Sequence, residues 1–261
     1  MYINNARLLI CIAGTLLFFA CKKNELYITK PAPVTDGEAQ VKVINLSAYQ
    51  KNPLYHLKIN DVRVSNILGG TTNPTPFPGG GLNTGGLSTA DYLSIKAGSN
   101  TFTVATPFVG TSNDSTVIAT GTATLEGNKR YSVFFTDTLT KTNFIVVEDT
   151  LSRPDSGYAK FQFVNLMPNL TALDLYIGTV KIPEASNIPF KGVSKPFLLP
   201  TNNASTTWAI RTAGGTANLT TYASASTLGN QRAYTVFARG YSTVTAATDI
   251  RRQAISFIYT R

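Results

Sequence analysis

The sequence predicts an all-β protein that contains two tandem, immunoglobulin-like antiparallel β-sandwich domains. Three observations predict this fold class. Short runs alternate apolar and polar side chains, turn residues separate these runs, and the second half of the chain repeats the order of elements in the first half. No run of helical period is long enough to indicate a helix. About seven or eight short strands in each half favour a sandwich, and a β-barrel remains the alternative.

The alternation has a period of two residues. Val41 and Val43 flank Lys42, for example, in the first of these runs. Successive side chains of a strand point to opposite faces, so this pattern predicts strands with one buried face. The same alternation is found in segments 101–104, 131–135 and 161–163. Residues typical of turns separate the runs, at 60–61, 97–100, 127–128, 178–179, 214–215 and 229–230.

An internal duplication organises the body of the chain. Segment 41–46 matches 161–166, and segment 57–60 matches 175–178. Asn-Ile at 66–67 pairs with 187–188, and 127–134 matches 229–237 with one inserted residue. Each copy has the length of an ordinary domain, which is too long for a solenoid unit. We therefore expect β-sandwich domains at residues 39–152 and 153–261.

The N-terminus is predicted to be a secretory signal at residues 1–20. Arg7 precedes the apolar stretch from Leu8 to Phe19, which is shorter than the roughly 20 residues that span a bilayer. Residues 17–21, Leu-Phe-Phe-Ala-Cys, resemble a bacterial lipobox, although Phe18 stands where Leu is usual. This resemblance implies that Cys21 carries acyl chains and holds the protein on a membrane of the cell envelope, with the outer membrane as the expected one. A retained transmembrane anchor is the alternative, and residues 21–38 are expected to form the lipidated tether.

Composition narrows the function classes. The formal net charge is +9, but charged residues make up only 14% of the chain and basic residues are scattered. This composition disfavours a disordered chain and a nucleic-acid partner. The two cysteines both lie near the N-terminus, which excludes a multi-cysteine zinc site and a disulfide framework in the body.

No catalytic motif is found, and we expect neither an enzyme nor a cofactor or metal site. The single histidine, His56, lies in a strand pattern with no partner at metal-ligand spacing. The glycine-rich run 76–86 lacks the Lys-Ser/Thr of a phosphate loop. Glu148 and Asp149 are adjacent, and neighbouring strand residues face opposite ways, so they are not expected to share a site.

Aromatic side chains are the candidate ligand-binding residues, because their faces stack on sugar rings. The candidates are Trp208, Phe77, Tyr92 and Tyr222. Aromatic residues in strands usually fill the core instead, and Trp208 aligns with Phe102 or its neighbour in the first copy, which favours the core.

Residues 159–166 followed by 172–177, with the sequence Leu-Asp-Leu-Tyr-Ile, resemble the bacterial family known as domain of unknown function 4397. The first copy departs from the pattern, because Tyr55 or His56 stands near the place of Asp174. The resemblance covers most of residues 39–261, in two copies. It implies an extracytoplasmic β-sandwich module, often found in lipoproteins, with no established activity.

Together these observations predict a non-catalytic, lipid-anchored envelope protein that binds or presents a partner. A glycan is the first ligand class to consider, and an envelope protein is another. The alternative is a structural or adhesion spacer with no small ligand.

Overall fold

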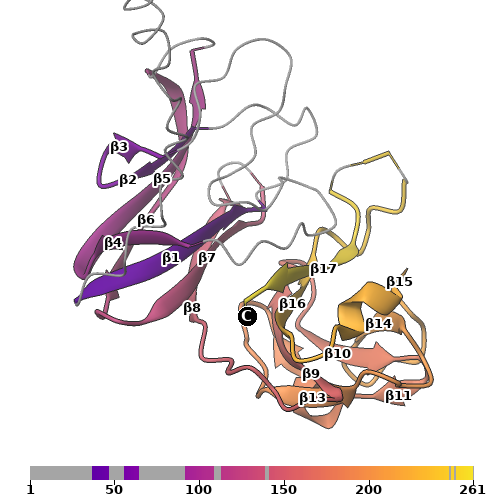
Figure 1. Ribbon diagram of the computed structural model, residues 1–261. Helices are drawn as coiled ribbons and strands as arrows, with labels where there is room; N and C mark the ends of the chain where they lie inside the picture. The colour runs from indigo at the N-terminus through magenta and orange to yellow at the C-terminus, as the bar shows by residue number, and fades with distance from the viewer. Residues whose placement is uncertain are drawn as a thin grey trace, which may run out of the picture. The chain divides into compact units, whose positions relative to one another are not determined.

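The computed structural model describes residues 37–46, 56–64, 92–108, 113–138, 141–246, 248–249 and 251–260. These residues form strands and two short 3-10 helices, with no α-helix among them (Figure 1). The all-β prediction is confirmed. Within the described residues no helix is both long enough and apolar enough to cross a membrane. Residues 36–261 make up one compact unit, and the division into two domains at residue 153 stays a prediction.

The first half of this unit contains two four-stranded sheets. One has the strand order β4-β1-β7-β8 and the other β3-β2-β5-β6. The strands of the first sheet are β1 (Glu38–Asn45), β4 (Leu93–Lys96), β7 (Arg130–Thr136) and β8 (Asn143–Glu148). The strands of the second are β2 (His56–Ile59), β3 (Val62–Arg63), β5 (Gly98–Pro107) and β6 (Asp114–Leu125).

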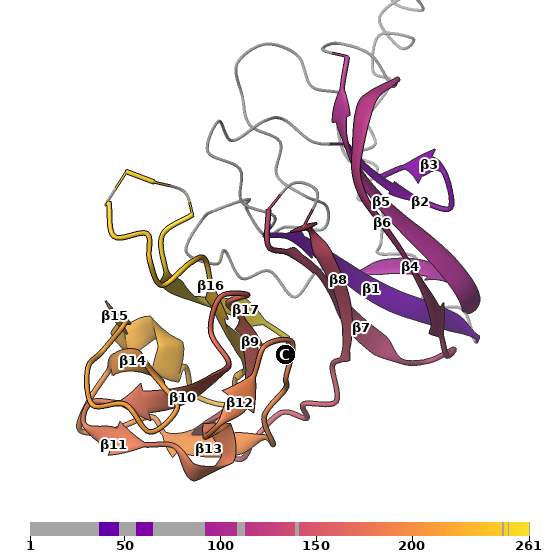
Figure 2. The same ribbon diagram turned by 180° about the vertical axis from the view of Figure 1, so that it is seen from behind.

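The second half contains two further sheets. One has the order β13-β9-β16-β17, and the other has the order β11-β10-β14-β15 with β12 also paired to β10 (Figure 2). The strands of the first are β9 (Tyr158–Leu166), β13 (Phe197–Pro200), β16 (Ala233–Arg239) and β17 (Ala254–Tyr259). Those of the second are β10 (Ala172–Ile177), β11 (Val180–Lys181), β12 (Ile188–Pro189), β14 (Thr207–Thr212) and β15 (Thr220–Ala223). The 3-10 helices are η2 (Pro183–Ala185) and η3 (Ala225–Leu228).

The sequence repeat reappears as a repeat of strand pairing. Val41 of β1 lies opposite Tyr131 of β7, and Phe161 of β9 lies opposite Tyr234 of β16. The duplication aligns Val41 with Phe161 and Tyr131 with Tyr234, so the two pairs occupy equivalent positions in the two halves. The two sheets β4-β1-β7-β8 and β13-β9-β16-β17 therefore have the same strand order and an equivalent register at their centres.

Both of these central pairs are parallel, which the sequence did not predict. The remaining pairs among the named strands are antiparallel, as expected. Parallel neighbours need a long crossover connection. In each half the chain forms the opposing sheet between the two parallel strands, and this segment serves as the crossover.

Apolar side chains fill the space between the two sheets of each half. In the first half the core contains Val41, Val43, Phe102 and Phe135, and in the second it contains Phe161, Phe163, Trp208 and Phe257. The alternation of the sequence therefore predicted the inward faces correctly. Stacked and edge-on aromatic rings, such as Phe161 against Trp208 at 5.0 Å, make the second core dense.

The other faces of β1, β7, β9 and β16 are covered as well, so these strands have two buried faces rather than one. Their side chains form a third apolar cluster together with residues of β8 and β17 and with Leu46 just after β1. Its members are Ile44, Leu46, Phe134, Val147, Val164, Leu166, Phe237 and Ile258. Strands buried on both faces carry apolar residues at successive positions. This explains the run of buried residues from Val43 to Leu46.

Candidate functional site

The strongest candidate site is a cavity of about 550 Å³ at the open edge of the second half. It lies between β11 and β13, which are the outermost strands of their two sheets. The loop after β13 closes one end of the cavity with Asn203, Ala204 and Ser205. The site is thus formed where the two sheets of the second half part from each other.

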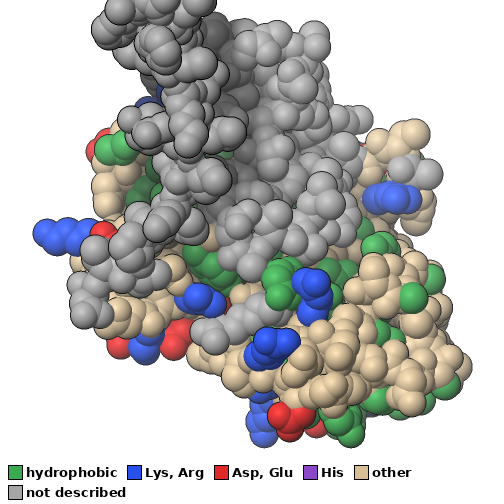
Figure 3. Space-filling model, viewed as in Figure 1, with side chains coloured by type: hydrophobic (Ala, Val, Ile, Leu, Met, Phe, Trp, Pro, Cys, Tyr) green, Lys and Arg blue, Asp and Glu red, His purple; other side chains and the backbone are tan. Residues whose placement is uncertain are grey.

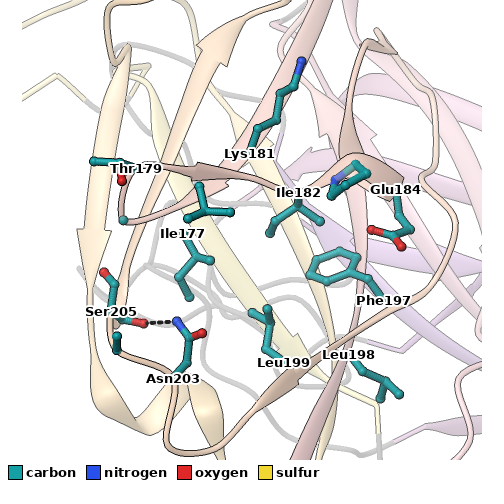
Figure 4. A pocket seen from close by; sticks show the side chains of 14 residues that line it. Ile177, Thr179, Lys181, Ile182, Glu184, Phe197, Leu198, Leu199, Asn203 and Ser205 are labelled. Carbon is teal, nitrogen blue, oxygen red and sulfur yellow. Dashed lines mark hydrogen bonds between the residues drawn. The ribbon is translucent and has the colours of Figure 1, made fainter.

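The floor of this cavity is aliphatic with one aromatic ring. Ile177, Ile182, Phe197 and Leu199 point toward one another across it (Figure 4). Ile177 and Ile182 each retain 4% of their surface exposed, and Phe197 retains 6%. All four belong to the second core or pack against it, so the cavity is an extension of that core to the surface.

The mouth of the cavity carries two exposed aliphatic side chains, Val180 on β11 and Leu198 on β13. They are 65% and 52% exposed. Large apolar side chains that rim a hollow mark binding surfaces more often than isolated ones do. The polar groups at the mouth include Lys181, Glu184 and Asn203.

A tight turn between β10 and β11 shapes the cavity wall. Gly178 has a φ of 59°, in the left-handed region, and a Cβ placed there would lie 2.9 Å from Cβ of Ser205. Only glycine suits both the backbone conformation and this close approach. Nearby, Asn203 donates from Nδ2 to the carbonyl of Ser205 at 2.7 Å, which orders the loop at the end of the cavity.

A second cavity of about 560 Å³ adjoins the first and shares Pro183 and Glu184 with it. Its other lining residues are Ser186, Ile188, Val193, Ser194 and Lys195. We call the two cavities together the edge groove. It has an aliphatic chamber, lined by Ile177, Ile182, Phe197 and Leu199, and a polar chamber, lined by Glu184, Ser186, Ser194 and Lys195.

The carboxylate of Asp174 fixes the segments beside the groove. Oδ1 accepts hydrogen bonds from the backbone N–H of Asn187 at 2.7 Å and from the hydroxyl of Ser186 at 3.0 Å. Oδ2 accepts from the N–H of Gly214 at 3.0 Å and lies 3.6 Å from Nζ of Lys181. Burial raises the pKa of Asp174, but these donors outweigh it and hold the pKa below its ordinary value. The carboxylate is therefore an ionised structural anchor.

Three of the predicted ligand-binding residues, Tyr92, Trp208 and Tyr222, lie in the described part of the chain, and none of them lines the groove. Trp208 is fully buried, and its indole N–H donates to the hydroxyl of Thr227 at 2.8 Å. The buried ring has no face on which a sugar could stack, which agrees with the alternative that it belongs to the core. Tyr222, on β15, is half-buried against Phe257, with ring centroids 5.5 Å apart.

Tyr92 belongs to a polar cluster at the sheet β4-β1-β7-β8. Its hydroxyl donates to Asp149 at 3.0 Å, and the hydroxyl of Ser132 donates to the same carboxylate at 2.8 Å. Burial raises the pKa of Asp149 to about 6, while Ser132, Tyr92 and the positive charges of Lys42 and Arg130 limit the rise. The remaining predicted site residues, Cys21 and Phe77, lie outside the described residues.

The acidic and imidazole groups that sequence analysis examined are not gathered into a site. Asp149 is buried, whereas Glu148 is exposed and pairs with Lys129 at 3.3 Å, so the two carboxylates do point to opposite sides as predicted. His56 is buried in β2, 3.6 Å from Asp114, and burial lowers the pKa of its imidazole. No group of three or more metal-ligating His, Cys, Asp or Glu residues is found in the described part of the chain.

Sequence analysis missed the edge groove, because three separate segments, 177–184, 197–199 and 203–205, build it. The sequence signal that could have indicated these edge strands is the position of the prolines. Pro183, Pro196 and Pro200 lie in and around two short strands, and proline within a strand pattern indicates a sheet edge.

The family model described as a domain of unknown function, DUF4397, matches residues 80–176. This is well under half of the chain, and the match runs across the predicted domain boundary into β10. A search of the curated proteins found no match.

Two solved structures from work on streptococcal virulence factors are similar in part. One concerns α-glucan recognition by family 41 carbohydrate-binding modules, with 13% identity over 79% of this chain and 94% of that one. The other concerns α-glucan binding by a streptococcal virulence factor, with 11% identity over 77% and 92%. Both have a TM-score of 0.21, and no ligand is transferred from them to this chain.

Proposed function

We propose that this chain is a non-catalytic, lipid-anchored envelope protein that binds a partner in the edge groove. The observation that carries the proposal is an apolar hollow between two edge strands, with Val180 and Leu198 exposed at its mouth. Pockets that hold ligands combine apolar walls with a few polar groups, as the edge groove does. The buried carboxylates Asp149 and Asp174 are occupied by hydrogen bonds from the protein itself, which supports a role in structure rather than catalysis.

The proposed anchor is the acylated Cys21, with the protein held at the outer membrane. Several acyl chains give stable membrane association, whereas one gives only marginal binding. Replacing Cys21 with Ala is expected to move the protein from the membrane fraction to the soluble fraction of cells. Continued membrane association of the C21A variant would contradict the anchor.

We further propose that residues 39–152 and 153–261 are two copies of one module. The shared strand order and the equivalent register of β1 with β7 and of β9 with β16 support this. His56 lies next to Leu57, which pairs with Val104, and Asp174 lies next to Leu175, which pairs with Ile210. The carboxylate anchor of the second copy is therefore replaced by a histidine in the first.

No nucleic acid is proposed as a partner, despite the net charge of +9. On the face seen in Figure 3, the Lys and Arg side chains of the described residues are scattered rather than gathered in one patch. A nucleic-acid site requires clustered positive charge that follows the phosphate backbone.

The test is a binding screen with residues 22–261, which contain the whole compact unit 36–261. The panel contains cell-wall and plant glycans, extended peptides and amphiphiles. Ala204 is an exposed residue that lines the groove, and Ala217 is an exposed loop residue that does not. We expect at least one ligand class to bind, and A204W but not A217W to block it. Equal binding by both variants, or no binding across the panel, would contradict the proposal.

A second candidate function, a structural spacer, is favoured by the threonine surface of β5 and β6. Thr101 and Thr122 hold their hydroxyls 3.2 Å apart, and so do Thr103 and Thr120. Such cross-strand pairs stabilise a sheet without presenting a ligand site. If no ligand of the panel binds, the spacer function is favoured over the binding function.

A further inference from the structure

The edge of β13 presents few groups for strand addition. Thr201 donates its backbone N–H to the carbonyl of Gly157, on the side of β9. Because backbone N–H groups along a strand point alternately to its two sides, the N–H of Leu198 points away from β9, and Pro200 occupies the next position of that kind. Proline has no N–H, so Leu198 has the one donor that β13 offers at its free edge. Pro196 immediately before the strand offers none. Because peptides that add to a sheet bind through a ladder of such donors, this edge disfavours an extended peptide.

The groove also lacks a platform for a sugar ring. Among the described residues that line the two chambers, Phe197 is the one aromatic residue. It is 6% exposed, and its ring is stacked on Phe161 with centroids 5.5 Å apart at an angle of 22°. Sugar recognition by stacking needs an exposed aromatic face, and the ring of Phe197 is already covered.

The aliphatic chamber instead matches a hydrocarbon chain. Its walls are the side chains of Ile177, Ile182 and Leu199, and Val180 and Leu198 continue the apolar surface to the mouth. Burying hydrocarbon in such a chamber is favourable by about 0.8 kcal/mol for each methylene group.

The polar chamber supplies one acid and one base. Glu184 and Lys195 both line it, and neither forms an ion pair within the described residues. The two serines are already engaged, since Ser186 donates to Asp174 and Ser194 donates to the carbonyl of Lys195. A ligand head group would therefore meet Glu184 and Lys195, whose charges together complement a zwitterion.

We infer that the edge groove binds an amphiphile, with an aliphatic chain in the aliphatic chamber and a zwitterionic head group in the polar chamber. This inference rests on the proposed function of the groove and specifies the ligand class. It is independent of the lipid on Cys21, because the test uses protein without that residue.

The test is equilibrium binding of dodecylphosphocholine, below its micelle concentration, to residues 22–261. Dodecyl sulfate and dodecyltrimethylammonium carry single-charged head groups on the same chain, and glycerophosphocholine carries the head alone. We expect dodecylphosphocholine to bind most tightly and glycerophosphocholine not to bind. Affinity should fall about tenfold for every two methylene groups removed from the chain. A204W should weaken binding at least tenfold, whereas A217W should leave it unchanged.

The double variant E184Q/K195Q tests the head group, and is expected to remove the preference for dodecylphosphocholine over the two charged detergents. Amphiphile binding that A204W and A217W affect equally would be nonspecific and would overturn the inference. If a glycan or peptide binds and only A204W blocks it, while no amphiphile binds, the inference fails and the proposed function stands. If nothing in the panel binds, both fail.

Discussion

The indole N–H of Trp208 donates a hydrogen bond of 2.8 Å to the hydroxyl of Thr227, inside the core of the second half. Thr227 in turn donates to the carbonyl of Ser224 at 2.7 Å, so the bond ties β14 to the helix η3. The ring packs edge-on against Phe161 and Phe257, at 5.0 and 5.3 Å. A buried tryptophan with a satisfied N–H contributes to stability rather than to ligand contact.

Replacing Trp208 with Phe should therefore destabilise the protein without affecting ligands. The substitution removes the hydrogen bond to Thr227 and part of the ring volume, and we expect the free energy of unfolding to fall by about 1–3 kcal/mol. Urea denaturation followed by circular dichroism measures this. A W208F variant of unchanged stability that lost glycan binding would instead make Trp208 a ligand residue.

Asp174→Asn should lower the free energy of unfolding at neutral pH and make it depend less on pH below about 4. The side-chain NH2 of the introduced asparagine would face donors that now bond to the carboxylate, which costs about 2–3 kcal/mol of stability. Since the pKa of Asp174 is held below its ordinary value, the native protein should lose this stability as pH falls below about 4. Urea denaturation at pH 7 and pH 3.5 compares the two proteins. The exposed Asp155, as D155N, is the control, and an equal loss in both variants would contradict the anchor.

Asp149 should show the opposite dependence on pH. Its pKa of about 6 lies above that of an unfolded Asp, so between about pH 4 and 6 the folded protein binds a proton that the unfolded chain has released. The contribution of Asp149 to stability is therefore fully present below about pH 4 and is lost as pH rises through 6, by at most about 3 kcal/mol. The stability difference between native protein and D149N, measured at pH 4 and pH 7, should fall with rising pH. A constant difference would mean that the carboxyl titrates normally.

Pro196 and Pro200 should keep β13 from pairing with a second molecule. The variant P196V/P200V restores two backbone N–H donors. It is expected to cause self-association that increases with concentration, because an exposed apolar edge strand is a template for pairing. Sedimentation velocity over a concentration series measures this. Pro168, in the turn after β9, is the control as P168V. Equal behaviour of the two variants would show that the prolines do not protect the edge.

The sequence was informative wherever a local pattern decided the structure. Alternation placed Phe161 and Phe163 in the core. The sequence aligned Trp208 with Phe102 or its neighbour, and in the structure Trp208 lies opposite Ile177 while Phe102 lies opposite Ile59. It was not informative where distant segments meet. The parallel pairing of β1 with β7 joins strands about 90 residues apart, and no local signal encodes such a register.

The groove was hidden for the same reason, since Ile177 on β10 and Leu199 on β13 belong to different sheets. The aromatic candidates were chosen by residue type, and type alone does not separate a buried ring from an exposed one. Trp208 shows this most clearly, because the ring with the greatest capacity for stacking is also among the most buried side chains of the fold.

The most direct test of the central claim, that the edge groove is the ligand site, is methyl nuclear magnetic resonance of residues 22–261. The protein is titrated with dodecylphosphocholine and with the tightest glycan or peptide from the panel. We predict that the largest shift changes fall on the methyl groups of Ile177, Ile182 and Leu199, and that A204W removes them. Shift changes confined to other methyl groups, such as those of Val117 on β6, would contradict the claim.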